Sequence, residues 1–190
     1  IDYDEVFYEI ANEKNLIPKG IKKTKVEVRR YLKDQGKEEL FTLLQGEVYG
    51  SRINLAKQSK GMFETIKMLK KKEIELFIVS HKTLHPYAGP KFNLHEAALK
   101  WLTQNNFFKT SELDFEKKNI FFELTVENKI KRIESLGITH YIDDLTKILE
   151  LISPTINRIH YNPKAKNSNI DNIFNLRSWT SLPKLLDELS

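Results

Sequence analysis

Residues 74–83 of the chain read IELFIVSHKT, and this stretch decides the fold class. Its first six residues are almost wholly apolar, which is typical of a strand buried on both faces of a parallel sheet. Polar residues follow, so the strand is expected to end at about Ser80. Comparable short strands are expected at residues 120–122, 139–142, 158–161 and 176–179. Helical patterns separate them, and strands that alternate with helices predict a doubly wound, mainly parallel sheet.

The stretch before residue 61 has a different pattern. Apolar residues recur there at helical spacing, and no convincing strand interrupts them. Thr24 and Glu27 form a capping box, which marks the start of a helix, and Thr125 is expected to cap a helix of the later stretch. We therefore predict an α/β protein with a small helical region over residues 1–60 and an α/β core over residues 61–190.

The composition excludes several classes of protein. Of the 190 residues, 40% are hydrophobic and 11% aromatic, which is enough for a sizeable buried core. The absence of cysteine rules out a disulfide scaffold, a zinc–thiolate site and a thiol nucleophile. No apolar run reaches the ~20 residues of a membrane span, and no signal-like segment opens the chain. We expect a soluble, cytoplasmic protein without a membrane partner.

Polar residues that suit phosphate chemistry follow two of the predicted strands. Ser80, with His81 and Lys82 after it, ends the first strand, and Asp143 and Asp144 end the strand at residues 139–142. Ligands of doubly wound sheets bind beyond the carboxyl ends of the strands. A hydroxyl and an ammonium group can hold phosphoryl oxygens, and carboxylates can hold Mg²⁺. Each residue also has a purely structural interpretation, as a turn, a helix cap or a solvated side chain.

These motifs resemble those of the haloacid dehalogenase superfamily of phosphatases. The family's second motif is Ser or Thr at the end of a strand, as at Ser80. Its third motif is a lysine upstream of the fourth, as at Lys129, and its fourth is an acidic pair that ends a strand, as at Asp143 and Asp144. The resemblance covers residues 61–161, and residues 1–60 look like the helical cap that this family inserts between its first and second motifs.

The resemblance implies a Mg²⁺-dependent phosphatase that acts on a small phosphorylated metabolite through a phosphoaspartyl intermediate. By this resemblance Ser80 hydrogen-bonds the phosphoryl group and Lys129 neutralises the intermediate. Asp144 is the direct ligand of Mg²⁺, and Asp143 supports it. His81 and Lys82 are the expected substrate contacts. The sequence leaves open the identity of the substrate and the oligomeric state.

The family's first motif, Asp-x-Asp after a strand, supplies the nucleophile and the general acid and base. Asp2 and Asp4 match its spacing, but one residue before Asp2 is too short for a strand of ~5 residues. The two carboxylates fit better at the start of a helix, where the macrodipole favours them. We therefore expect the nucleophile to lie upstream of Ile1 and outside this chain.

Two other classes of function stay open. One is a non-catalytic binding or regulatory module on the same fold, which gains support if the chain has no nucleophile. The other is nucleic-acid binding, suggested by the net charge of +5 and by a lysine-rich helix end, residues 67–72. Without an aromatic-rich strand or a recognition-helix motif, we do not expect a nucleic-acid partner. Weaker candidates for substrate contact are Glu47, Tyr49, Arg52 and His85.

Overall fold

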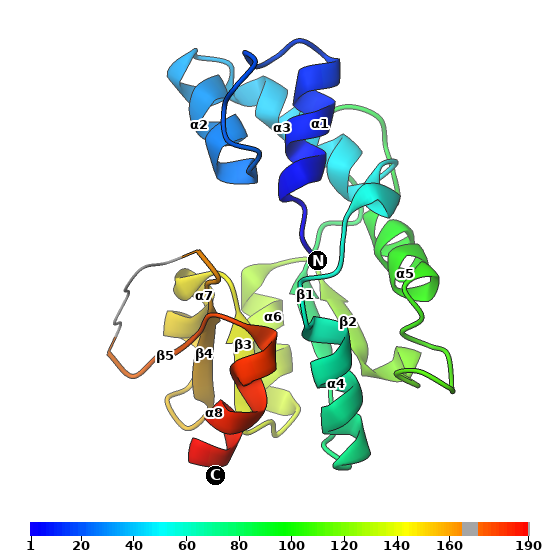
Figure 1. The fold of residues 1–190 in the computed structure, drawn as a ribbon, viewed down its shortest axis with the longest axis vertical. Coiled ribbons are helices and arrows are strands. Elements are labelled where there is room, and N and C mark those ends of the chain that lie inside the picture. Colours follow the sequence, from blue (N-terminus) through cyan, green and yellow to red (C-terminus); the bar gives the residue numbers. More distant parts are fainter. Residues whose placement is uncertain (165–170, 190) are drawn as a thin grey trace. The chain divides into compact units, whose positions relative to one another are not determined.

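The computed structural model describes residues 1–164 and 171–189, and Figure 1 shows the fold. It confirms a mixed α/β protein with parallel strands and an N-terminal helical region. The chain divides into two compact units. The helical unit comprises Ile1–Gln58 and Thr83–Lys109, and the α/β unit comprises Ser59–Lys82 and Thr110–Ser190. The first boundary lies close to the predicted one at residue 60, but residues 83–109 belong with the helices.

The helical unit is built on amphipathic helices that bury one face each. Phe7 and Phe41 stack at its centre with ring centroids 5.2 Å apart, and both are buried. The predicted capping box is present, since Thr24 Oγ1 accepts a hydrogen bond from the main-chain nitrogen of Glu27. The elements of this unit are α1 (Asp4–Glu13), α2 (Lys25–Asp34), α3 (Glu38–Tyr49), η1 (Ile53–Leu55) and α5 (Leu94–Gln104).

The loop at residues 83–93 belongs to the helical unit because it packs closely on α3. Gly46 lies on the buried side of that helix, and a Cβ placed there would be 3.0 Å from Pro86 Cβ and 3.1 Å from the carbonyl oxygen of Ala88. The loop is closed by a main-chain hydrogen bond from Leu94 to Leu84 of 2.9 Å. The glycine therefore allows the loop to contact the helix more closely than any larger residue would.

The strands described in the α/β unit fall into two parallel sheets. One sheet pairs β1 with β2, and the other has the order β3-β4-β5. Helix α6 leads from β2 in the first sheet to β3 in the second. The strand bounds are β1 (Ile78–His81), β2 (Ile120–Glu123), β3 (His140–Asp143), β4 (Asn157–Tyr161) and β5 (Phe174–Leu176).

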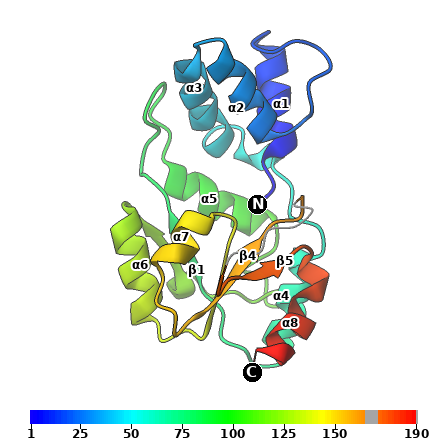
Figure 2. The same cartoon turned by 90° about the vertical axis from the view of Figure 1, so that its left-hand side faces the viewer.

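Helices cover both faces of these sheets (Figures 1 and 2). One apolar core joins α6 and α7 to one face and includes Ile133, Tyr141 and Leu149. A second core joins α4 and α8 to the opposite face around Leu69 and Ile159. The helical elements of this unit are α4 (Met62–Lys71), η2 (Lys117–Asn119), α6 (Val126–Ser135), α7 (Thr146–Leu151), η3 (Trp179–Ser181) and α8 (Leu182–Glu188). No helix in the described part of the chain is long and apolar enough to span a membrane.

The first strand starts later than its apolar run predicts. Ile78 is the first residue of β1, and it pairs with Ile120, the first residue of β2. Ile74 lies before this ladder and is exposed. The length of a strand depends on its partner, and β2 has only four residues. The prediction of a strand buried on both faces is also wrong in degree, since Ile78, Val79 and Ser80 are half-buried and His81 is exposed.

Candidate active site

The carboxyl ends of β1 and β3 carry the residues that the sequence singled out. Ser80 lies opposite Phe122 in the β1–β2 ladder, and Asp143 is the last residue of β3. The hydroxyl of Tyr141 connects the two strands, because its oxygen lies 3.1 Å from the carbonyl oxygen of Val79 and 3.2 Å from Asp143 Oδ2. The Tyr141 side chain therefore contacts both Val79, the residue before Ser80, and Asp143 at the end of β3.

Lys129 reaches this site from α6. Its side chain is buried, with 6% of the residue exposed, and its Nζ lies 2.6 Å from Asp143 Oδ2. Thr125 fixes the start of α6, as predicted, by accepting a hydrogen bond from the main-chain nitrogen of Asn128. The Lys129 ammonium also lies 5.6 Å from the centre of the Tyr141 ring. A buried lysine is costly unless it is paired, so the ion pair with Asp143 holds this cation in place.

The carboxylate of Asp143 is surrounded by protein donors. Oδ2 accepts from Lys129 and lies near the Tyr141 hydroxyl, while Oδ1 accepts from the main-chain nitrogen of Leu145 at 2.9 Å. Burial and the adjacent carboxylate of Asp143 raise the pKa of Tyr141, so its hydroxyl stays protonated and can donate. Asp143 therefore serves mainly to position Lys129 and the start of α7.

Asp144 supplies a second carboxylate at the end of β3. It is exposed and directly follows Asp143. No group of three or more acidic, histidine or cysteine side chains gathers around a possible metal position in the described ranges. Mg²⁺ often takes one or two carboxylates and completes its shell with water and phosphate oxygens. The Asp144 carboxylate is thus one oxygen donor of the kind that Mg²⁺ takes.

Lys82 places a second cationic group after β1. Its main-chain nitrogen donates to the carbonyl oxygen of Glu123, which extends the β1–β2 ladder by one bond of 2.9 Å. Burial lowers the pKa of the Lys82 ammonium to about 8. His81 beside it is exposed, and Ser80 is half-buried. Lys82 therefore brings a half-buried amino group to the end of β1.

The acidic pair near the amino terminus makes local contacts in the helical unit. Asp2 Oδ1 accepts from the main-chain nitrogen of Asp4 at 3.0 Å, and Asp4 Oδ1 accepts from that of Lys25 at 2.9 Å. Asp2 also forms an isolated bridge with Lys57. Asp4 lies in the first turn of α1, as expected, but the N-cap of that helix is Tyr3 and no side chain caps it, so the expected carboxylate N-cap is not formed.

The weaker candidates also lie in the helical unit. Glu47 pairs with Lys14 at 2.9 Å, and Arg52 pairs with Glu13 at 3.0 Å. His85 Nδ1 lies 3.1 Å from the carbonyl oxygen of Phe92, within the loop that packs on α3. The structure does not bring these residues together with Ser80, Lys129 and Asp143 in one unit.

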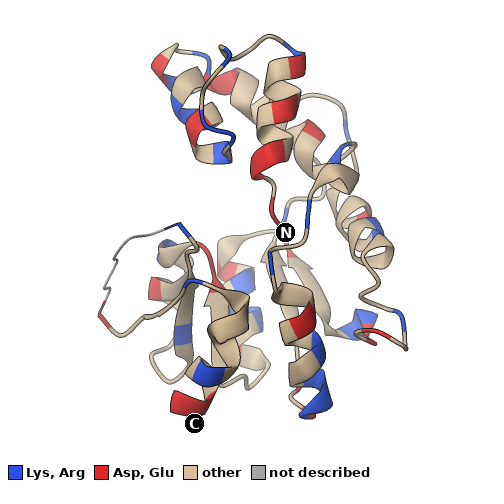
Figure 3. Cartoon of the chain, viewed as in Figure 1, with Lys and Arg blue, Asp and Glu red and all other residues tan. Residues whose placement is uncertain are grey.

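Basic residues gather at the end of α4 (Figure 3), and three of its lysines contact neighbouring groups. Lys67 pairs with Glu112 at 2.7 Å, and Lys72 lies 3.9 Å from Asp187. Lys70 donates to the carbonyl oxygen of Asp114. These contacts favour a structural role for the lysines over a basic surface for nucleic acid.

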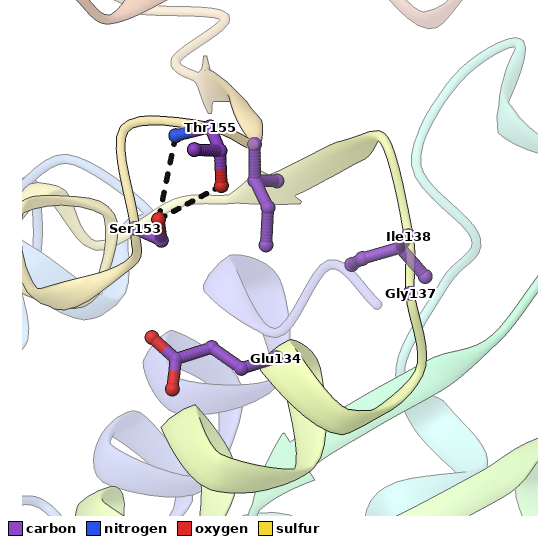
Figure 4. A pocket seen from close by; sticks show the side chains of 6 residues that line it. Glu134, Gly137, Ile138, Ser153 and Thr155 are labelled. Carbon is purple, nitrogen blue, oxygen red and sulfur yellow. Dashed lines mark hydrogen bonds between the residues drawn. The ribbon is translucent and has the colours of Figure 1, made fainter.

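A surface hollow occurs at the opposite edge of the β3-β4-β5 sheet, before β3 and β4 begin (Figure 4). The Ser153 and Thr155 hydroxyls in its lining bond each other at 2.8 Å. Its one charged lining residue is Glu134, so it does not suit a phosphate. The lining consists of Glu134, Gly137, Ile138, Ser153, Thr155 and Ile156.

Tyr141 is the site residue that sequence reasoning missed. It lies two residues before Asp143, so both side chains project from the same face of β3. The alternation of side chains along a strand is the sequence signal that could have placed Tyr141 beside Asp143. Comparisons with known proteins add nothing to this site, since no family model, no curated protein and no solved structure matches the chain.

Proposed function

We propose that this protein is a Mg²⁺-dependent phosphatase that hydrolyses a small phosphoric monoester through a phosphoaspartyl intermediate. The observation that carries the proposal is the buried pair of Lys129 and Asp143 at the end of β3, linked through Tyr141 to the end of β1 beside Ser80. A buried cation held by one carboxylate at the carboxyl edge of parallel strands suits a doubly charged phosphoryl group.

Each residue has a distinct role in this proposal. Lys129 offsets negative charge on the phosphoryl group and its aspartyl ester, and the Ser80 hydroxyl donates to a phosphoryl oxygen. Asp144 would hold Mg²⁺, which supplies charge neutralisation on the phosphoryl oxygens when bound. Lys82 and His81 contact the substrate. Positioning and electrostatic stabilisation then supply most of the rate enhancement.

The attacking group is a carboxylate on a further strand. In the reaction, its oxygen forms a bond to phosphorus while the ester bond to the substrate alcohol breaks and the alcohol takes up a proton. Water then hydrolyses the acyl phosphate and releases inorganic phosphate. We propose that this strand lies between β1 and β3 and completes a single doubly wound sheet, like that of the haloacid dehalogenase superfamily. The helical unit corresponds to that family's cap.

Hydrolysis of p-nitrophenyl phosphate by the full-length protein, with Mg²⁺ or with a chelator, tests the proposal. Asp144→Asn should abolish the stimulation by Mg²⁺, and Ser80→Ala should lower turnover by roughly the 10²–10³-fold that one lost transition-state donor costs. Lys131→Met is the matched control, because Lys131 is an exposed residue of α6 that pairs with Glu127. Turnover that is indifferent to both the chelator and Asp144→Asn would exclude this mechanism.

A second candidate is a binding or regulatory module that recognises a phosphorylated ligand without turnover. Lys129 and Tyr141 both donate hydrogen bonds to Asp143. These contacts favour the binding module, because they already give the three side chains a structural role. Calorimetry with a non-hydrolysable phosphonate separates the two candidates. Binding that Lys82→Met weakens, together with no hydrolysis by the full-length protein, would support the module.

A further inference from the structure

The positive charge of the protein is concentrated in the helical unit. Residues 19–37, the basic segment, contain eight lysine and arginine residues and two acidic ones, a net charge of +6. The whole chain has a net charge of +5, so all its other residues together carry a charge of −1. A solvated helix face usually mixes charges of both signs. One tenth of the sequence therefore forms a distinct basic region.

Helix α2 carries part of this charge on its outward side. Val28 and Leu32, which lie one turn apart, are completely buried and hold the helix against the rest of the unit. Arg29, Arg30 and Lys33 are exposed. Figure 3 shows basic residues along α2 and on the loop before it. The exposed cations of the basic segment are Lys19, Lys22, Lys23, Arg29, Arg30, Lys33 and Lys37.

The main chain of the basic segment is held at both ends of α2. At the start of the helix, Asp4 Oδ1 accepts a hydrogen bond of 2.9 Å from the main-chain nitrogen of Lys25. At its end, Gly36 adopts a φ of +68°, and the main-chain nitrogen of Lys37 donates to the carbonyl oxygen of Leu32 at 2.8 Å. A ligand that binds here would therefore have to order little main chain, which lowers the entropic cost of binding.

Most of the exposed cations are available to an anionic ligand. Arg29 pairs with Glu38 at 3.2 Å. Arg30 pairs with Glu27 on the same helix. Exposed pairs of this kind contribute little to stability, so phosphate oxygens can replace these carboxylates. The lysines of the basic segment that form no ion pair with a described residue are Lys19, Lys22, Lys23, Lys33 and Lys37.

The character of this surface favours a nucleic acid over a membrane. A helix that inserts into a membrane interface needs an exposed apolar face, and Val26 is the only large apolar side chain of α2 that is exposed. Exposed lysines and arginines suit the repeating phosphates of a nucleic acid. Tyr8 adds a half-buried aromatic ring, whose centre lies 5.2 Å from Lys23 Nζ. Proteins that bind single strands combine cationic and aromatic side chains in this way.

We propose that the basic segment binds a single-stranded nucleic acid through its phosphate backbone and without sequence preference. The absence of a recognition motif excludes base readout, but it does not exclude this mode of binding, because counterion release supplies the affinity. The inference goes beyond the proposed function and does not depend on it, since the residues at the ends of β1 and β3 take no part in it.

Fluorescence anisotropy of a labelled single-stranded DNA of about 20 nucleotides, titrated with the 190-residue chain, tests this proposal. We expect saturable binding whose logarithmic affinity falls linearly with the logarithm of the salt concentration. The slope should be about −3.5 if the five unpaired lysines each contact one phosphate. Combining Lys22→Gln, Lys23→Gln and Lys33→Gln should reduce the slope to about −1.4, because three of these contacts are lost.

A second triple variant in the same unit provides the matched control. It combines Lys91→Gln, Lys100→Gln and Lys109→Gln, which are exposed positions of the helical unit outside the basic segment. This variant loses the same charge but should keep the slope of the unmodified chain. Circular dichroism checks the folding of both variants. Equal slopes for the two triple variants, or no binding at low salt, would overturn the proposal.

Two further measurements use the unmodified chain and separate nucleic acid from other anionic partners. Unlabelled DNA should displace the probe, whereas poly-glutamate of the same length should displace it only weakly. Equal displacement by both polymers would overturn the proposal, because it would show a surface for any polyanion. Sedimentation with phosphatidylserine vesicles, combined with no binding of DNA, would overturn it in favour of a membrane.

Discussion

The hydroxyl of Tyr141 on β3 lies 3.1 Å from the carbonyl oxygen of Val79 on β1. These residues are 62 positions apart, and their contact is a side-chain link between two sheets that share no ladder in the described part of the chain. The same hydroxyl lies 3.2 Å from Asp143 Oδ2. A hydroxyl has one proton, so it donates to one of these two acceptors at a time. A change in the position of β1 relative to β3 should therefore change the hydrogen bond that Tyr141 makes to Asp143.

Removal of this hydroxyl should weaken the α/β unit modestly. Tyr141→Phe keeps the buried ring but loses a hydrogen bond, which typically contributes about 1 kcal/mol to the free energy of unfolding. Urea unfolding of the 190-residue chain measures the change. Tyr87→Phe is the control, because Tyr87 is 81% exposed. This variant should have the same free energy of unfolding as the unmodified chain. Equal stability of all three proteins would show that the Tyr141 contact is not maintained in solution.

The pair of Lys129 and Asp143 should behave as a strongly coupled unit. Their side chains are only 7% and 8% exposed, so removing one partner leaves a buried charge unpaired. We expect Lys129→Met to cost about 3–5 kcal/mol, and Lys129→Met with Asp143→Leu to cost much less than the sum of the two single changes.

A second ion pair on α6 provides the control for this cycle. Lys131 and Glu127 are 70% and 75% exposed, and such pairs contribute about 0.3–0.5 kcal/mol. The corresponding double-mutant cycle should therefore give a small coupling energy. Comparable coupling energies for the two pairs, measured by urea unfolding, would contradict the burial of Lys129.

Lys82 should make stability depend on pH in the alkaline range. Burial lowers its pKa from 10.5 to about 8 in the folded chain. Between these values the unfolded chain binds more protons than the folded one, so the free energy of unfolding should rise with pH across this window. Lys82→Met should remove that part of the slope, while Lys91→Met, at an exposed position, should keep it. An unchanged slope in Lys82→Met would contradict the burial of this ammonium group.

Much of the fold could be predicted because its signals are local. Thr24 and Thr125 cap the helices that they were expected to cap, and His140–Asp143 differs from the predicted strand by one residue at each end. Capping and hydrophobic periodicity involve residues within a few positions of each other. α7 begins at Thr146, and Asp143 Oδ1 accepts a hydrogen bond from the main-chain nitrogen of Leu145, the residue before it.

Features that depend on distant partners could not be predicted in the same way. Ile74 has the apolar character of a strand residue but lies before the first paired residue of β1. In the site, the acidic pair could be predicted because it follows an apolar strand in the sequence. The partner of Asp143 could not be predicted. Only the fold shows that Lys129 on α6 reaches Asp143 and that Tyr141 spans to Val79.

The packing of the loop at residues 83–93 on α3 predicts a large effect at Gly46. A leucine there would collide with Pro86 and with the carbonyl oxygen of Ala88, since even a Cβ would lie 3.0–3.1 Å from them. Overpacking of this kind costs about 1–3 kcal/mol, and we expect it to detach the loop rather than α3. Hydrogen exchange should then accelerate at Leu94, whose main-chain nitrogen donates to Leu84. Gln45→Leu, one residue earlier and half-buried, should leave that exchange rate unchanged, and a Gly46→Leu protein with the same protection would show that the loop does not rest on this helix.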